Sequence, residues 1–120
     1  MKWLLLAVFV FSASSIAEQS KENRCDGNHL LPECRTAIDF ADHNIVNTFE
    51  NGYNTGYCMG LVTGIADGLR VMCVPDDVTY TQMERVVFKY LNDHPNQLHL
   101  WESLLVTQAL VQAFPCPTKK

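Results

Sequence analysis

The stretch Tyr57–Val74, Y-C-M-G-L-V-T-G-I-A-D-G-L-R-V-M-C-V, constrains the fold most strongly. Glycine recurs at every fourth position from Gly56 to Gly68, within a helical apolar pattern. Each glycine in a helix interior costs roughly 0.8–1 kcal/mol relative to alanine, so close contact elsewhere has to offset several of them. A strip of bare backbone lets another helix approach closely, as small residues do in membrane helices. We therefore predict a central helix that is buried on more than one side, its glycine strip covered by another helix of the same chain. A subunit interface along Gly60 and Gly64 is the alternative.

The first residues have the pattern of a secretory signal peptide. Lys2 supplies a positive start, Trp3–Phe11 is an unbroken apolar run, and Ser15-Ile16-Ala17 is a small-x-small cleavage site. The apolar run is too short to span a bilayer as a mature anchor. We expect residues 1–17 to be removed after export, followed by a flexible polar leader over residues 18–27.

The rest of the chain is long enough for one hydrophobic core and too short for two. The full chain has a formal charge of −4, and the part that remains once Lys2 is removed with the signal peptide has about −5. An acidic exported domain is a poor candidate for binding nucleic acid or an anionic membrane, and a basic protein partner suits it better. We predict no nucleic-acid partner and no membrane contact after cleavage.

Five cysteines remain in the mature chain: Cys25, Cys34, Cys58, Cys73 and Cys116. In an exported protein the default expectation is disulfides, although sequence alone leaves their pairing open. The odd cysteine is expected to be Cys25, which lies in the polar stretch E-N-R-C-D-G-N outside any periodic segment. It is then a free thiol facing solvent, or it forms an intermolecular disulfide.

Four helices account for the apolar periodicity. The first begins after an Asn28 cap and runs about three turns to Ala41, with Pro32 tolerated in its first turn. The central helix starts from a cap at Asn54 or Thr55 and stops at Met72–Val74, because Pro75 disfavours helical geometry before it. The third follows the capping box of Thr79 and Gln82 and ends near Asp93 or His94, before Pro95, and the last runs from about Leu100 to Phe114.

The segment Asp42–Tyr53 is rich in asparagine. We predict one helical turn or an irregular loop that the turn signal Asn51-Gly52 closes, with Ile45, Val46 and Phe49 touching the core. No useful stretch alternates with period two. The predicted fold class is all-α, a small disulfide-bonded bundle or orthogonal array of about four helices.

Enzymatic and metal-binding interpretations find little support. A Cys-His nucleophile would pair Cys25 with His29 or Cys34 with His43, but the flanking sequence typical of such sites is missing. The histidines His29, His43, His94 and His99 lack metal-ligand spacing. We predict no enzyme activity, no cofactor and no metal. Asp67 and Arg70 are expected to pair at i, i+3, and their charges argue against a membrane span.

Four blocks of sequence carry a family resemblance. They are Y-C-M-G-L-V-T-G-I-A-D-G, C-V-P-D-D-V-T, V-V-F-K-Y-L-N-D-H-P-N-Q-L-H and A-L-V-Q-A-F-P-C. In this order the chain, from about Gly27 to Cys116, resembles the resistance-associated (Rap/Tai) group of immunity proteins. The resemblance implies a periplasmic, disulfide-bonded helical protein, often a homodimer. Such a protein blocks a peptidoglycan amidase effector delivered by type VI secretion, an enzyme that uses a Cys-His nucleophile pair.

The resemblance and the expected helix positions together favour the pairs Cys34–Cys58 and Cys73–Cys116 within an immunity-like domain at residues 28–117. The cognate amidase effector is the implied partner. Recognition loops usually sit on rigid scaffolds, so Asn44, Asn47, Glu50 and Tyr53 are the expected partner-binding residues. Trp101, Tyr57 and Tyr80 are further aromatic candidates for an interface, with a place in the core as the expectation for most of these aromatic side chains. The alternatives are a small periplasmic stress protein or chaperone, or an orphan structural member of the fold.

Overall fold

A computed structural model describes residues 25–118; the predicted signal peptide and most of the predicted leader lie outside this range. The described chain folds into α1 (Gly27–Ala41), α2 (Phe49–Gly68), α3 (Tyr80–Asp93), the short 3-10 helix η1 (Pro95–Gln97) and α4 (Glu102–Ala113). Within residues 25–118 the only extended pairing is an isolated antiparallel bridge between Asp26 and Trp101. The predicted all-α class with four helices is confirmed. No helix in the described range has the length and apolarity needed to cross a membrane.

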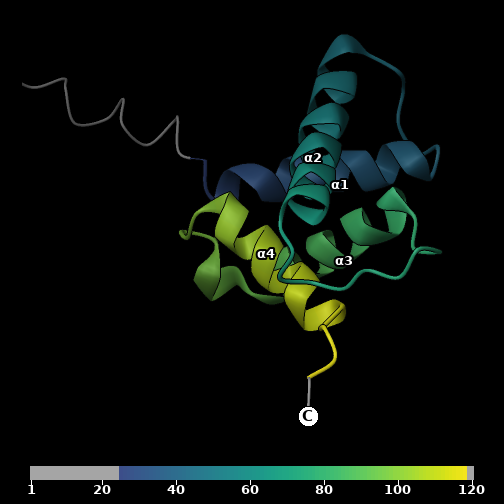
Figure 1. The fold of residues 1–120 in the computed structure, drawn as a ribbon. Helices are drawn as coiled ribbons and strands as arrows, with labels where there is room; N and C mark the ends of the chain where they lie inside the picture. The colour runs from purple at the N-terminus through teal and green to yellow at the C-terminus, as the bar shows by residue number, and fades with distance from the viewer. Residues whose placement is uncertain (1–24, 119–120) are drawn as a thin grey trace, which may run out of the picture.

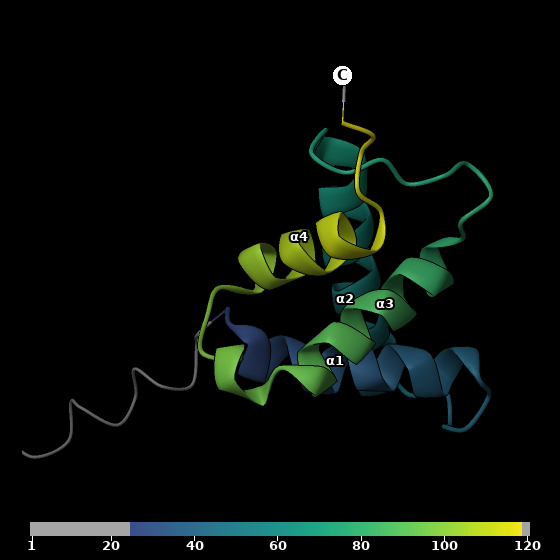
Figure 2. The ribbon, with the colours of Figure 1, turned by 90° about the horizontal axis from the view of Figure 1, so that it is seen from below.

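The helices form an orthogonal array rather than a parallel bundle. α2 crosses α1 steeply, and its first turns project beyond the rest of the domain (Figure 1). Seen from below, α3 and α4 lie over the same side of α1, with α2 standing behind them (Figure 2). This arrangement leaves one side of α2 without a neighbouring helix.

The core draws on all four helices. Its buried apolar side chains are Leu30, Cys34, Ala37, Cys58, Val62, Met72, Met83, Val87, Leu91, Leu105, Val106, Ala109 and Leu110. α2 is the longest helix, yet it contributes only Cys58 and Val62 to this fully buried set. The central helix is therefore buried along one narrow face.

The prediction that another helix of the chain covers the glycine strip is wrong. At each of five glycines in α2, a Cβ added to the backbone would meet no atom within 4 Å: Gly52, Gly56, Gly60, Gly64 and Gly68. A four-helix domain of this size has too few elements to surround its longest helix, because α1, α3 and α4 all pack on its other side. The strip faces open space.

α2 also begins earlier than predicted. Thr48 caps it, since the Thr48 hydroxyl accepts a hydrogen bond from the Asn51 backbone N–H at 3.1 Å. Asn51-Gly52 consequently lies in the first turns of the helix and does not close a loop. The predicted loop Asp42–Tyr53 is thus reduced to residues 42–48.

The other end of α2 differs from the prediction as well. The helix ends at Gly68 and the chain is already extended at Leu69 (φ −104°, ψ 135°), several residues before Pro75. Asp67 and Arg70 therefore do not share a helical face, and no ion pair joins them among the described residues. The predicted i, i+3 pair is wrong.

The remaining boundaries follow local capping signals. Asp26 rather than Asn28 caps α1, so this helix has 15 residues and about four turns, and Gly27 belongs to it rather than to a flexible leader. The Thr79 hydroxyl accepts a hydrogen bond from the Gln82 backbone N–H at 3.1 Å, and α3 ends at Asp93, as predicted. α4 lies within the predicted range, while η1 was not predicted.

Candidate partner-binding surface

The loop over residues 42–48 is fixed at its start. Both nitrogens at the end of the Arg85 side chain donate to the Asp42 carboxylate, at 3.3 and 2.5 Å, which joins the loop to α3. The hydrogen bond from Arg85 is the main reason that the pKa of the Asp42 carboxyl lies below its ordinary value. The Asn44 backbone N–H donates to the Asp39 carbonyl at 2.8 Å. His43 between them adopts a left-handed conformation with φ 58°.

The end of the loop is fixed too. The side-chain amide of Asn51 donates to the Val46 carbonyl at 2.9 Å, in addition to the cap that Thr48 provides. Both anchors come from the first turn of α2, so the loop and the projecting end of this helix form one unit. A surface on this unit loses little conformational entropy when a partner binds.

This unit carries an exposed apolar patch, which we call the outer patch: Val46, Phe49 and Tyr53. Their exposed fractions are 75%, 92% and 59%. The expectation that Val46 and Phe49 touch the core is wrong, because the helix that carries Phe49 projects away from the core (Figure 1). Large exposed apolar side chains grouped on a rigid element are typical of interaction sites.

The residues predicted to bind a partner surround or belong to this patch. Asn44 and Asn47 lie in the loop, whereas Glu50 and Tyr53 lie in the first turns of α2, and all four are exposed. Sequence reasoning missed Val46 and Phe49, the two most exposed large apolar side chains of the described chain. The Thr48 capping signal could have placed Phe49 at a helix start.

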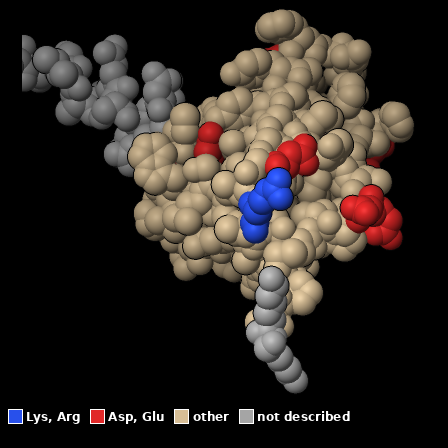
Figure 3. All heavy atoms as spheres, viewed as in Figure 1, with Lys and Arg blue, Asp and Glu red and all other residues tan. Residues whose placement is uncertain are grey.

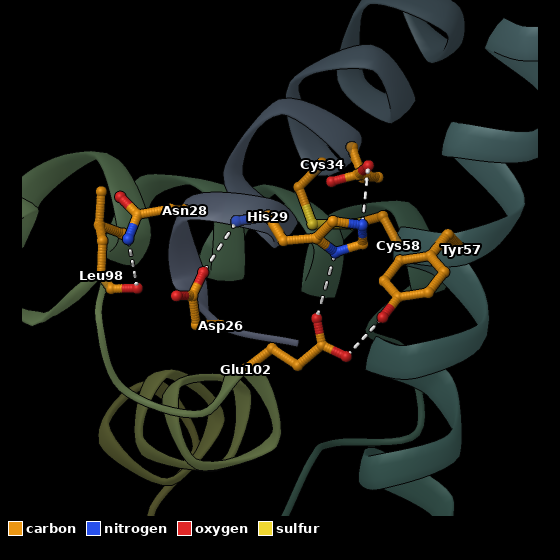
Figure 4. Close-up of polar contacts among 9 residues, drawn as sticks. Asp26, Asn28, His29, Cys34, Tyr57, Cys58, Leu98 and Glu102 are labelled. Carbon is orange, nitrogen blue, oxygen red and sulfur yellow. Dashed lines mark hydrogen bonds and ion pairs between the residues drawn. A yellow bond between two sulfur atoms is a disulfide. The ribbon is translucent and has the colours of Figure 1, made fainter. Parts of the chain in front are cut away.

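Tyr53 is connected by ring contacts to a partly buried polar cluster at the base of α2. Its ring lies 6.3 Å from that of Tyr57, and the Tyr57 ring packs edge-on against His29 at 5.1 Å between centroids. The Tyr57 hydroxyl donates to Glu102 at 2.5 Å (Figure 4). These contacts join α2 to the starts of α1 and α4, and hold the base of the projecting end in place.

The cluster contains two carboxylates around one imidazole. The His29 ring nitrogens lie 3.6 Å from Glu33 and 3.6 Å from Glu102. Figure 4 shows the Glu102 carboxylate between the His29 ring and the Tyr57 hydroxyl. Only 7% of Glu102 is exposed, and one of its oxygens has no hydrogen-bond partner. Burial, followed by the hydrogen bond to Glu102, raises the pKa of the Tyr57 hydroxyl above its ordinary value, so this hydroxyl stays protonated and donates.

The partners of His29 and of the cysteines do not match the Cys-His pairs considered from the sequence. Both ring nitrogens of His29 face carboxylates, not a thiol, and Cys34 is joined to Cys58. Cys25 is exposed and unpaired. Among residues 25–118, no three His, Cys, Asp or Glu side chains are grouped so that they could hold a metal ion.

Two disulfides cross-link the elements. Cys34 and Cys58 join α1 to α2 where the helices cross, with Cα atoms 5.1 Å apart. Cys73 and Cys116 join the segment after α2 to the chain after α4, with Cα atoms 4.8 Å apart. In the chain-entropy model, loops of these lengths stabilise the fold by roughly 3.5 and 4 kcal/mol.

The other aromatic candidates lie elsewhere. Trp101 is exposed at the start of α4 and Tyr80 at the start of α3, whereas Tyr57 is half-buried in the polar cluster. None of them belongs to the outer patch.

Comparison with known protein families gives a match over most of the described chain. A sequence model of the family described as Rap1a immunity proteins matches residues 26–116. The matched range includes all four helices and the four cysteines that form disulfides. The chain matches no curated protein and no solved structure.

Proposed function

The chain belongs to the Rap1a immunity protein family, and on that basis we propose that it neutralises a toxic effector by binding it. The effector is a peptidoglycan amidase that a neighbouring cell delivers by type VI secretion. The protein acts in the periplasm after removal of residues 1–17. It performs no chemistry of its own and blocks the effector's access to the cell wall.

The outer patch carries this proposal, because it is the most exposed apolar surface on a rigid part of the domain. Covering a phenylalanine side chain such as Phe49 is worth roughly 2–3 kcal/mol of hydrophobic free energy. Asn44, Asn47 and Glu50 surround the patch with polar groups. An apolar centre within a polar rim is the usual anatomy of a protein–protein interface.

Phe49→Ala in a binding assay tests the proposal. The partner is the purified product of the small cysteine-peptidase-like gene expected beside this one, and the readouts are its affinity and its cleavage of murein. We expect the variant to weaken binding by about 2 kcal/mol, or roughly thirtyfold, with a matching loss of inhibition. Leu104→Ala is the matched control, because Leu104 is exposed and apolar but lies on α4.

Two outcomes would contradict the proposal. If the wild-type protein does not bind or inhibit the amidase, the effector assignment fails, and suppression of client aggregation would then favour the chaperone alternative. If Phe49→Ala and the triple replacement of Asn44, Asn47 and Glu50 both leave the affinity unchanged, the effector binds another surface.

We further propose that the open glycine strip of α2 forms a homodimer contact. A strip without side chains lets two helices approach closely, and a two-fold axis between Gly60 and Gly64 would place each of these glycines against the other in the second copy. Such a contact leaves Phe49 accessible to the effector, because Phe49 lies about three helical turns from Gly60. Gly64→Leu should keep the helix intact and abolish a dimer seen by light scattering. An equal mass for both proteins would count against this contact.

A further inference from the structure

A concave surface lies at the end of α2 opposite to the outer patch. The α2–α3 groove is an open cavity of about 880 Å³ between the last turn of α2, the segment 69–79 and the first turn of α3. Met72 and Met83 form its buried apolar floor, and Leu69 and Tyr80 are exposed at its rim. Methionine side chains adapt readily to different apolar shapes. The groove thus offers an apolar anchor site.

The walls of the groove are fixed within the chain. The Cys73–Cys116 disulfide ties segment 69–79 to the chain after α4, and the Cys73 backbone N–H donates to the Phe114 carbonyl at 2.9 Å. The Val78 backbone N–H donates to the Pro75 carbonyl at 3.1 Å, just before the Thr79 cap of α3. Because the groove is formed in advance, an occupant pays little to order it.

The charges around the groove have no partners inside the described chain. Asp67, Arg70 and Asp76 line it, and none of them takes part in an ion pair among residues 25–118. Asp77 next to the lining is also exposed. The lining and its neighbour thus carry three carboxylates and one guanidinium. The face of the molecule drawn in Figure 3 likewise has acidic side chains in several places and basic ones in one small area. The rim is therefore mainly acidic.

We infer that the α2–α3 groove binds a segment of the effector in which an apolar side chain stands beside lysine or arginine. The apolar side chain enters between Met72 and Met83, and the basic group meets Asp67 and Asp76. A second copy of this chain fits less well, because a two-fold contact through the groove would bring these carboxylates toward their own counterparts. An anionic membrane is disfavoured by the same charges.

This inference rests on the proposed function only for the origin of the segment. Asp67 follows Phe49 by 18 residues, which separates the groove from the outer patch by roughly 27 Å along α2. Substitutions in one surface therefore leave the other unchanged, and the two proposals can fail separately.

Capped pentapeptides test the groove without the effector. One probe has phenylalanine between two lysines, and the other has phenylalanine between two glutamates. Methyl NMR spectra are recorded for the disulfide-bonded domain as each peptide is added at low salt. We expect the lysine peptide to shift the Met72 and Met83 methyl signals and the glutamate peptide to leave them in place. Shifts that are equal for both peptides, that fall outside the groove, or that are missing at millimolar peptide would overturn the inference.

The double variant Asp67→Asn/Asp76→Asn tests the role of charge. We expect it to weaken the lysine peptide about fivefold, as the loss of two rim charges would. The control Asp39→Asn/Asp93→Asn changes the net charge equally at two residues that do not line the groove, and it should bind the lysine peptide like wild type. Equal weakening by both variants would show that net charge, not the groove, attracts the peptide. If the groove binds the lysine peptide but Asp67→Asn/Asp76→Asn leaves effector affinity unchanged, the occupant is not an effector segment.

Discussion

Replacing two glycines of the open strip should stabilise the domain. An alanine Cβ at Gly60 or Gly64 meets no atom within 4 Å, so the substitution creates no clash. Each Gly→Ala change in an exposed helix interior gains about 0.8–1 kcal/mol, so Gly60→Ala/Gly64→Ala should gain about 1.6–2 kcal/mol. For a domain of this size, each kcal/mol raises Tm by roughly 4–8 °C. Urea and thermal unfolding, followed by circular dichroism at low protein concentration, measure both quantities.

Gly27→Ala is the matched control, since it makes the same chemical change in a crowded place. A Cβ on Gly27 would lie 2.5 Å from a methyl carbon of Leu105 and 2.9 Å from the Leu98 Cα. The Leu98 backbone cannot move aside without disturbing its hydrogen bond with Asn28. We expect Gly27→Ala to lose about 1–3 kcal/mol, as overpacking usually does.

The sign of the change in unfolding free energy decides whether the glycine strip is open. A loss of stability for Gly60→Ala/Gly64→Ala at low concentration would refute the open strip, because it would mean that the strip is covered within one chain. At high concentration the proposed dimer adds a second effect. The added methyl groups then separate the two helices, and the gain in stability should shrink.

Three further predictions concern the buried groups and a disulfide. Glu84 is 2% exposed, and one of its carboxyl oxygens has no hydrogen-bond partner. Burial raises the pKa of this carboxyl above its value of 4.5 in the unfolded chain, so the contribution of Glu84 to stability falls as the pH rises above 4.5. Glu84→Gln should therefore stabilise the domain at pH 7 by about 1 kcal/mol and flatten the pH dependence of its unfolding free energy. Tyr57→Phe removes the hydrogen bond to Glu102 and should cost about 1–3 kcal/mol in urea unfolding, whereas an unchanged midpoint would mean that water replaces the hydroxyl. Cys73→Ser/Cys116→Ser should lose about 4 kcal/mol, and a non-reducing peptide map that joins Cys34 to Cys73 in the wild type would contradict this pairing.

Signals that act within one turn of helix were predictable from the sequence. Thr79 and Gln82 fixed the start of α3, and Pro95 marked its end. The start of α2 was not predictable in this way, because Asn51-Gly52 is a strong turn signal that competes with the Thr48 cap just before it. Local rules conflict there, and only the folded chain shows which one prevails.

The outer patch and the polar cluster depend on contacts between distant parts of the chain. Val46 and Phe49 are as apolar as core residues, and only the projection of α2 makes them exposed. Tyr57 and Glu102 are 45 positions apart, so nothing in the local sequence links them. The glycine spacing predicted a close contact along the strip, but no atom of the described chain lies there, and a contact with a second copy stays a proposal.

For an exported chain, as proposed above, the position of Cys25 has a consequence for the order in which the disulfides form. The order of the cysteines along the chain is Cys25, Cys34, Cys58, Cys73 and Cys116. In the structure Cys34 pairs with the next cysteine, Cys58, and Cys73 pairs with the next, Cys116, while Cys25 at the start stays unpaired. An oxidase that joins cysteines as they appear would first link Cys25 to Cys34 and then Cys58 to Cys73. Both links must be exchanged before Cys34–Cys58 and Cys73–Cys116 can form, a rearrangement that takes minutes to hours without a catalyst. By that route maturation depends on disulfide isomerisation, and oxidative refolding of Cys25→Ser compared with wild type measures the delay.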